Sequence, residues 1–463
     1  MIDNDSWIYV GEGGKHVVFS STSREWKGRL LRVRREDLTG MATSSSSSSS
    51  SSSIKTSVEY LRRIVHPLLQ PYFDVPELIE LSPDTARKLM EQAIESGKIP
   101  QSRLVSWTLK PTLRYGDPDS LLFATLLHDY KQIAGHEGSY WSFEIKPKAG
   151  YLAFSPLIDP RHRLKCEQTR FSIQQQLLTR GIVQKGWTSV VTQPSAYNPL
   201  DLFSCDETRV KTALEALLDN PQNNLKIWHN DILILGHGVP AQQIPNEQAT
   251  SLLCALSLVL REESVLTKLL RTQLLDVIDG DGAVMLYNHL VELCNGDQTQ
   301  VHELLDSAPS EVIVDEALGC LGASPFPRPK SATLDLLLSQ VERFSAEVST
   351  AEERDVAYHR IQGQISELSK LDCIFLLQNW LLSLTMCDVS VFVALAPSET
   401  AQNGTTPENA LWQFKGHQID KRPGLLQSTN GEWVYNVKVV DCDNKPASKL
   451  RKRGKKEAII RKL

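Results

Sequence analysis

The chain lacks the patterns typical of secreted, membrane and zinc-binding proteins. Its 463 residues include no N-terminal apolar segment of the kind that directs secretion and no uninterrupted apolar run long enough to span a membrane. Its eight cysteines stand singly, without a C-x-x-C pair or a cysteine and histidine cluster at zinc spacing. We therefore expect an intracellular protein of the cytoplasm, the nucleus or both, with reduced thiols that lie mostly in the core.

Charge is unevenly spread along the chain. A hydrophobic content of 41% in 463 residues is enough for two domain-sized cores, and the formal net charge is only −5. In contrast, only Glu457 opposes the basic side chains of the last fifteen residues, which are Lys449, Arg451, Lys452, Arg453, Lys455, Lys456, Arg461 and Lys462. A local basic run suits a small phosphorylated ligand or, alternatively, a nucleic-acid backbone.

The first part of the chain has the pattern of a small antiparallel sheet. Residues 7–10, 16–20 and 29–33 are rich in strand formers and are separated by glycine and serine. Two further strands are expected at residues 104–109 and 121–127. The second of these runs directly into a His-Asp-Tyr sequence.

Helices and a serine tract lie among these strands. Ser82 followed by Pro83 predicts the start of a helix that ends near Gly97, and residues 57–69 have helical periodicity. Residues 44–53 are an unbroken serine tract, which has no apolar side chain to bury. We expect a disordered surface loop there.

The second part of the chain is mostly helical in pattern. Helical periodicity is found near residues 207–218, 248–261, 264–278, 282–294, 331–347 and 357–385, and short strands are expected at 225–235, 389–395 and 433–440. The sequence therefore predicts an α+β protein of two lobes. The smaller, sheet-rich lobe comprises residues 1–133 and the larger lobe residues 134–463, with the ligand site in a cleft between them.

A glycine-rich turn follows the first expected strand. Gly11, Gly13 and Val18 match the phosphate-covering loop G-x-G-x-x-G-x-V, whereas His16 stands where its third glycine would be. Such a turn lets backbone N–H groups approach a triphosphate, and Arg32 on a neighbouring strand would reach back to it. The alternative is an ordinary hairpin turn with a solvated arginine.

The segment Glu144-Ile145-Lys146-Pro147-Lys148 concentrates charge on one side of a strand. Glu144, Lys146 and Lys148 project from the same face, since alternate residues of a strand share a face. Pro147 lacks a backbone donor and favours a strand edge or end. The two lysines suit phosphate groups, although a solvated edge strand has the same pattern.

Two aspartates stand at the ends of apolar strands. Asp388 precedes residues 389–393, and Asp441 follows residues 437–440. Phosphoryl transfer requires a carboxylate that holds magnesium and another that orients or deprotonates the attacking hydroxyl. Aspartate is also common at strand ends as a turn former, so each residue alone has a structural alternative.

Taken together, these segments resemble the inositol-pentakisphosphate 2-kinase family, in order and along nearly the whole chain. The matching segments are the glycine turn at 11–14, the Glu-x-Lys-Pro-Lys box at 144–148, residues 197–204, residues 221–226, and Asp441 with Lys445-Pro446. The resemblance implies an enzyme that uses ATP and Mg²⁺ to phosphorylate the 2-hydroxyl of inositol 1,3,4,5,6-pentakisphosphate, giving the hexakisphosphate (phytate). It also implies a two-lobe, kinase-like fold with a helical inositide-binding insertion in the second lobe.

The same resemblance implies a role for each matching residue. Asp388 would be the catalytic aspartate, Lys146 would lie at the reacting phosphate, and Asp441 would hold Mg²⁺. The implied nucleotide contacts are Gly13, Gly14, Lys15, His16, Arg32, His128, Asp129, Tyr130, Glu144, Lys146, Lys226 and Asp441. The implied substrate contacts are Lys148, Asn223, Asn224, Lys445, Lys449 and Arg453.

The chain also departs from the family pattern. Lys15-His16 replaces the usual Ala-Asn, and Ser172 stands where the family has a substrate lysine. Arg453 stands where plant relatives have tyrosine, and Lys226 where they have arginine. The chain has no counterpart of the cysteine and histidine set that binds zinc in plant relatives, so no zinc is expected.

Three other functions are alternatives for this sequence. A protein kinase is disfavoured because neither an H-R-D nor a D-F-G sequence occurs. A catalytically inactive scaffold that binds inositol phosphate needs only the basic residues, whereas Lys146, Asp388 and Asp441 together favour catalysis. The basic tail at 449–463 also suits nonspecific nucleic-acid binding. We expect a monomer that binds ATP and inositol pentakisphosphate and has no membrane or specific nucleic-acid partner.

Overall fold

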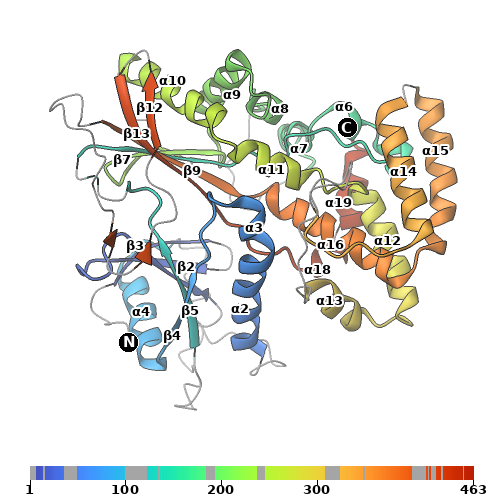
Figure 1. Cartoon of the computed structure of the whole chain (residues 1–463), viewed down its shortest axis with the longest axis horizontal. Helices are drawn as coiled ribbons and strands as arrows, with labels where there is room; N and C mark the ends of the chain where they lie inside the picture. Colours follow the sequence, from blue (N-terminus) through green and yellow to red (C-terminus); the bar gives the residue numbers. More distant parts are fainter. Residues whose placement is uncertain are drawn as a thin grey trace. The chain divides into compact units, whose positions relative to one another are not determined.

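The described residues form two compact units. The computed structural model describes residues 7–13, 16–35, 49–99, 122–133, 136, 138–183, 193–236, 246–307, 324–347, 350–398, 413–414, 417–418, 424–428, 431–451 and 453–463. The first unit combines Met1–Arg62 with Asp74–Gln132, and the second combines Arg63–Phe73 with Ile133–Leu463. Both contain helices and an antiparallel sheet (Figure 1), which confirms the predicted α+β class. The division into functional lobes at residue 133 stays a prediction.

The first unit is built on a five-stranded antiparallel sheet in the order β1-β2-β3-β5-β4. Alternation places Trp7 and Tyr9 in the core and Ile8 and Val10 in solvent. The apolar face packs with α4 (Pro83–Glu95), whose N-cap Ser82 accepts a hydrogen bond from Thr85 as predicted. The strands are β1 (Trp7–Glu12), β2 (His16–Ser21), β3 (Arg29–Arg34), β4 (Glu77–Leu81) and β5 (Leu122–His128). Strand β4 was not predicted, and the expected strand at 104–109 lies outside the described residues.

The structure begins a helix within the serine tract, and the disordered loop expected over residues 44–53 stays a prediction. Helix α2 runs from Ser49 to Tyr60 and so includes residues 49–53, whereas 44–48 lie outside the described part. Ile54 and Val58 lie on one side of this helix and are buried, which fixes its second half. Serine has an ordinary helix propensity, so a packed helix can extend backwards through it. The segment continues as a π-helical turn η2 (Leu61–Val65) and α3 (His66–Leu69).

The second unit contains a six-stranded antiparallel sheet in the order β12-β13-β9-β6-β7-β8. The strand expected at 225–235 is a hairpin, because Asn230 and Asp231 have φ values of 49° and 67° and reverse the chain. The strands are β6 (Trp141–Ile145), β7 (Leu225–His229), β8 (Ile232–Leu235), β9 (Ser390–Pro397), β12 (Gly424–Ser428) and β13 (Gly431–Val440). Strands β10 (Gln413–Phe414) and β11 (His417–Gln418) form a separate pair.

Helices make up the rest of the second unit. The helix expected over 357–385 is two helices, because Ser369 and Asp372 form a capping box that starts α16 after a break at residues 365–369. Helix α16 is largely buried and packs with α11 and α12, while α14 and α15 run side by side (Figure 1). The longer helices are α7 (Arg170–Thr179), α9 (Glu207–Asp219), α10 (Asn246–Glu262), α11 (Val265–Gln273), α12 (Asp279–Leu293), α13 (Gln298–Asp306), α14 (Ala332–Glu347), α15 (Ala351–Gln364) and α16 (Lys370–Met386). The shorter ones are η3 (Pro160–His162), α6 (Leu164–Glu167), α8 (Pro199–Leu202), η5 (Ile365–Glu367), α18 (Ser448–Arg451) and α19 (Arg453–Ile460).

The sequence led us to expect no membrane-spanning segment and cysteines that lie mostly in the core. Within the described ranges, none of the helices combines the length and apolar character that a membrane span requires. The described cysteines are free thiols, of which Cys294, Cys373 and Cys442 are buried and Cys205 is exposed. Only some of the described cysteines are therefore buried in the core.

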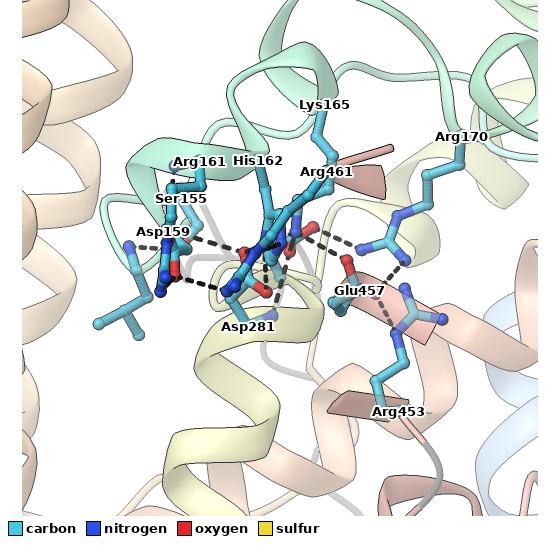
Figure 2. Close-up of polar contacts among 12 residues, drawn as sticks. Ser155, Asp159, Arg161, His162, Lys165, Arg170, Asp281, Arg453, Glu457 and Arg461 are labelled. Atoms are coloured by element: carbon cyan, nitrogen blue, oxygen red, sulfur yellow. Dashed lines mark hydrogen bonds and ion pairs between the residues drawn. The ribbon is translucent and has the colours of Figure 1, made fainter. Parts of the chain in front are cut away.

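A buried cluster of charged side chains ties helix α19 to the second unit (Figure 2). At its centre the Lys165 ammonium, fully buried, donates to Asp281 at 2.7 Å, to Glu457 of α19 at 2.8 Å, and to Asp279. Burial alone would lower the pKa of Lys165, but the three carboxylates outweigh it and raise the pKa. Their oxygens lie close enough together to share a metal ion, and the Lys165 ammonium is the cation that they share.

Further cations surround this centre. Arg170 donates to Asp279 at 2.5 Å, and Arg453 pairs with Glu457. On the other side, His162 lies 2.9 Å from Asp281 and accepts a hydrogen bond from Arg461 at 3.2 Å. The cluster therefore joins three stretches far apart in sequence, namely residues 159–170, 276–281 and 453–461.

We expect Lys165→Met to destabilise the protein strongly. Methionine has a similar length but leaves three buried carboxylates without their shared cation, and loss of one partner of a buried pair costs about 3–5 kcal/mol. Urea unfolding followed by circular dichroism measures the change. Lys211→Met is the matched control, because Lys211 makes a solvent-exposed pair with Glu207 and its loss should leave stability nearly unchanged. Equal stability of the two variants would contradict a structural role for the cluster.

Candidate active site

The predicted catalytic residues of the second unit lie at one end of its sheet. Strand register pairs Val440 of β13 with Ser390 of β9, and Ile145 of β6 with both Val391 of β9 and Leu225 of β7. Neighbouring antiparallel strands begin and end at the same edge. The residues just beyond these strand ends, which are Lys146, Lys148, Asn223, Asn224, Asp388 and Asp441, are therefore brought together although they come from separate motifs.

Asp388 lies between two lysines. Its carboxylate accepts from Lys148 Nζ at 3.1 Å and from Lys445 Nζ at 2.8 Å. Burial alone would raise the pKa of Asp388, but the two ammonium groups outweigh it and lower the pKa to about 2. The side chain is nevertheless 51% exposed, so a ligand can reach both the carboxylate and its lysines. This arrangement combines a fixed anion with two cations at a solvent-accessible point.

Asp441 and Lys146 form a second pair beside the first. Lys146 Nζ lies 3.6 Å from Asp441, whose side chain is 49% exposed and whose φ is 62°. A left-handed backbone at a non-glycine residue is strained and is often retained at functional sites. Mg²⁺ is held in nucleotide sites by one or two carboxylates and phosphate oxygens. The accessible Asp441 carboxylate fits such a role.

Glu144 is buried and already engaged. Its carboxylate accepts from Lys226 at 2.6 Å and from Ser390 at 2.8 Å. Burial alone would raise the pKa of Glu144, but Lys226, Lys146 and the Ser390 hydroxyl hold it below its ordinary value. Ser390 also lies 3.5 Å from Asp441, so its hydroxyl connects the two carboxylates. Sequence reasoning missed Ser390, whose signal was a single hydroxyl in the apolar run 389–393.

The backbone between Lys146 and Gly150 is held by the other motifs. Lys146 N donates to Asn224 O at 2.9 Å, and the buried Tyr197 hydroxyl donates to Pro147 O at 2.8 Å. Gly150 packs so closely against Phe203 that a Cβ there would lie 2.4 Å from the ring. The motifs at 197–204 and 221–226 thus support the segment that carries Lys146 and Lys148.

The remaining predicted substrate residues differ in accessibility. Asn223 is exposed in the turn before β7, whereas Asn224 is buried. Lys449 is exposed on α18, but the Arg453 guanidinium turns inward, pairs with Glu457 and lies 5.5 Å from the centre of the Trp380 ring. Arg453 is therefore engaged in the buried cluster. Its predicted substrate contact stays a prediction, as does the loss of a substrate cation at Ser172, which lies in the first turn of α7.

The predicted nucleotide residues of the first unit lie on its sheet and in the turn after β5. Arg32 Nη2 lies 2.9 Å from His16 Nδ1 across β2 and β3. Gly13 N donates to His16 O at 2.8 Å, which closes the glycine turn. Gly14 and Lys15 lie outside the described residues.

The expected adenine-binding segment begins where β5 ends. His128 is the last residue of that strand, and the rings of His128 and Tyr130 lie 6.2 Å apart. Asp129 N donates to Gly28 O at 2.8 Å, and the Asp129 carboxylate pairs with Lys131 at 3.3 Å. This segment is thereby anchored to the first unit.

Comparisons with known proteins agree with the motifs. A family model described as inositol-pentakisphosphate 2-kinase matches residues 9–458. A relative of that name from Arabidopsis thaliana is 28% identical over 334 aligned residues, which cover 62% of this chain and 70% of the relative. Another from Danio rerio is 31% identical over 255 aligned residues, which cover 53% of this chain and 47% of the relative.

The family match extends from the first strand to the C-terminal helix, so it includes every segment on which the resemblance was based. The prediction of the family and of its kinase activity class is confirmed. The chain belongs to the inositol-pentakisphosphate 2-kinase family.

Proposed function

We propose that the chain transfers the γ-phosphoryl group of ATP to the 2-hydroxyl of inositol 1,3,4,5,6-pentakisphosphate. The products are the hexakisphosphate and ADP: the hydroxyl oxygen forms a bond to phosphorus as the bond to the ADP oxygen breaks. The name of the family supports this reaction, since its members are named for phosphate transfer to inositol pentakisphosphate. ATP is the co-substrate that a kinase family implies.

One observation carries the proposal, namely the placement of Asp388 between Lys148 and Lys445. The acceptor has five phosphates of about −1.5 to −2 each, so its site must supply several cations. The hydroxyl to be phosphorylated must also meet a carboxylate that orients it and takes its proton. A carboxylate flanked by two accessible ammonium groups supplies both at one point.

Each residue then has a role in the transfer. Asp388 orients the hydroxyl and receives its proton, Lys148 and Lys445 bind phosphates of the acceptor, and Lys146 neutralises charge on the transferred group. Asp441 would hold Mg²⁺, which supplies charge neutralisation at the nucleotide phosphates. Glu144, which Lys226 and Ser390 hold, would contact the nucleotide, as would Lys226.

Residues of the first unit complete the proposal. Gly13, Gly14, Lys15, His16 and Arg32 would bind the nucleotide phosphates. The segment at 128–130 would hold adenine. We further propose that the enzyme acts as a monomer in the cytoplasm, the nucleus or both.

A direct assay tests the function. The purified chain is incubated with ATP, Mg²⁺ and inositol pentakisphosphate, and the products are separated by anion exchange. The inactive-scaffold alternative is not favoured by the family match, and it predicts inositide binding without hexakisphosphate. Absence of the hexakisphosphate would exclude the proposed reaction.

The two aspartates should differ in their effects. Asp388→Asn should lose turnover by about 10²- to 10⁴-fold while keeping ATP affinity, because an amide cannot take the proton. Asp441→Asn should abolish transfer and also weaken Mg²⁺-dependent ATP binding, because the amide has no charge to hold the cation. Steady-state kinetics and calorimetric titration with ATP separate the two outcomes. A variant at Asp388 that keeps most of its turnover would show that the role is wrong.

Asp388 should stay ionised at every ordinary pH in the free protein. Because the pKa of Asp388 is lowered to about 2, below the value of about 4 for an unfolded chain, its stabilising ion pairs are present above about pH 4 and lost as pH falls towards 2. We therefore expect no ionisation of Asp388 in the profile of kcat/KM for the inositide between about pH 5 and 8. Lys445→Ala should raise the pKa of Asp388, so that kcat/KM for the inositide begins to fall at a higher pH on the acidic side. An acidic limb near neutrality that vanishes in Asp388→Asn would contradict the assignment.

Charge should dominate binding of the inositide. Lys148→Ala and Lys445→Ala should raise KM for the pentakisphosphate by about tenfold, with a smaller effect on KM for ATP, whose base and ribose contacts are less ionic. Lys449→Ala separates two readings of the basic tail: it raises KM for the inositide if the tail binds substrate, and weakens only polynucleotide binding if the tail binds nucleic acid. Both KM values are measured at low and moderate salt. Equal effects on the two substrates would refute this division.

A further inference from the structure

Gln273 is a buried amide that touches both sides of the candidate active site. It is the last residue of α11, and it is 0% exposed. Its Nε2 donates to Lys148 O at 2.9 Å and to Met386 O at 3.1 Å, while its Oε1 accepts from Gly150 N at 2.9 Å. Both amide protons and the carbonyl oxygen are therefore engaged, and all three partners are backbone atoms.

Each of these backbone groups needs a partner from elsewhere. Lys148 has φ of 64°, so the chain bends there and leaves the ladder of β6. Met386 is the last residue of α16, where the final carbonyls have no partner within the helix. The Gln273 side chain thus supplies hydrogen-bond donors to carbonyl groups at two irregular places in the backbone. One lies shortly before Gly150 and the other shortly before Asp388.

The two points carry the two halves of an ion pair. Lys148 Nζ donates a hydrogen bond to the Asp388 carboxylate at 3.1 Å, and Asp388 lies two residues after the end of α16. The Asp388 side chain is half exposed, and an ion pair open to solvent has little power to fix its own geometry. The last turn of α16 also receives the Lys445 backbone, whose N donates to Thr385 Oγ1 at 3.3 Å. Besides the pairing of β6 with β9, the buried amide is a direct hydrogen-bonded connection between the backbone of Lys148 and the end of α16.

We propose that Gln273 is a positioning residue for phosphoryl transfer. It sets the distance between Lys148 and Asp388 through its hydrogen bonds to the backbone of Lys148 and to the backbone of Met386, two residues before Asp388. It touches neither substrate, and it acts through the geometry of the other two residues. This inference rests on the proposed function, because Lys148 and Asp388 matter for the reaction only if the chain is the kinase. Neither the motifs nor the family match points to this position.

Two substitutions test the proposal. Gln273→Met keeps the length of the side chain and removes its three hydrogen bonds, while Gln273→Glu keeps the acceptor and removes both donors. Displacement of reacting groups by about 1 Å can cost about a hundredfold, so we expect kcat/KM for the inositide to fall about ten- to a hundredfold and KM for ATP to stay within about twofold.

Asn379→Leu is the matched control for loss of a buried amide. Asn379 is also 0% exposed and bonds Ser324 and Phe375 O within the core. It should lose stability as the Gln273 variants do but keep wild-type KM and kcat in the folded fraction. A kinetic loss in Asn379→Leu as large as in Gln273→Met would overturn the proposal, because general loosening of the core would then explain both.

Hydrogen exchange gives a readout that does not depend on activity. Gln273→Met should speed exchange in peptides covering residues 148–152 and 387–389, whereas Asn379→Leu should not. Unchanged exchange there would overturn the proposal. If the wild-type chain makes no hexakisphosphate, the proposed function fails and the role of Gln273 in phosphoryl transfer fails with it. If the wild-type chain is active, calorimetry gives a binding readout: Gln273→Met must weaken binding of inositol pentakisphosphate more than Asn379→Leu does, and equal weakening would overturn the proposal.

A double-mutant cycle with Asp388→Asn isolates the mechanism. If Gln273 acts by placing Asp388, its substitution should cost much less turnover once Asp388 is already replaced. Additive losses would show that Gln273 acts independently of Asp388 and would overturn the proposed connection.

Discussion

The candidate site depends on one constraint, which is that a buried backbone must find hydrogen-bond partners after it leaves a sheet. Beyond Ile145 the chain continues as residues 146–150 without helix or strand. The amide of Lys146 and the carbonyls of Pro147 and Lys148 bond instead to Asn224 O, the Tyr197 hydroxyl and the Gln273 amide. The lysines therefore project from a backbone that distant segments hold in place.

Charge serves two purposes in the second unit, and burial distinguishes them. In the cluster around Lys165, cations and carboxylates are buried together and pair with one another. These ion pairs hold the C-terminal helix in place. Lys148 and Lys445 instead flank a half-exposed Asp388, where an incoming anion can compete for them. Desolvated pairs are costly to break and exposed ones are easily exchanged, which suits a scaffold and a ligand site respectively.

The sequence predicted the strands and motifs better than it predicted which of them meet in the folded protein. Asp388 and Asp441 were predicted at strand ends, but only the pairing of β9 with β13 shows that these ends meet. Periodicity also predicted one helix where Ser369 and Asp372 separate two. The Lys165 cluster joins residues more than a hundred positions apart, for which a single sequence has no signal. Gln273 looks like any helical glutamine, because its role arises from tertiary contacts alone.

The low pKa of Asp388 is a property of the protein without its acceptor. Partial burial favours the neutral acid, and the ammonium groups of Lys148 and Lys445 outweigh this preference. Under the proposed function the phosphates of the acceptor compete for the same two ammonium groups, and their greater charge draws the lysines towards them. The attraction that lowers the pKa of Asp388 then weakens, so under the proposed function we expect the basicity of this carboxylate to rise when the acceptor binds. On this proposal the carboxylate is a stronger base beside the hydroxyl of the bound acceptor than it is in the free protein.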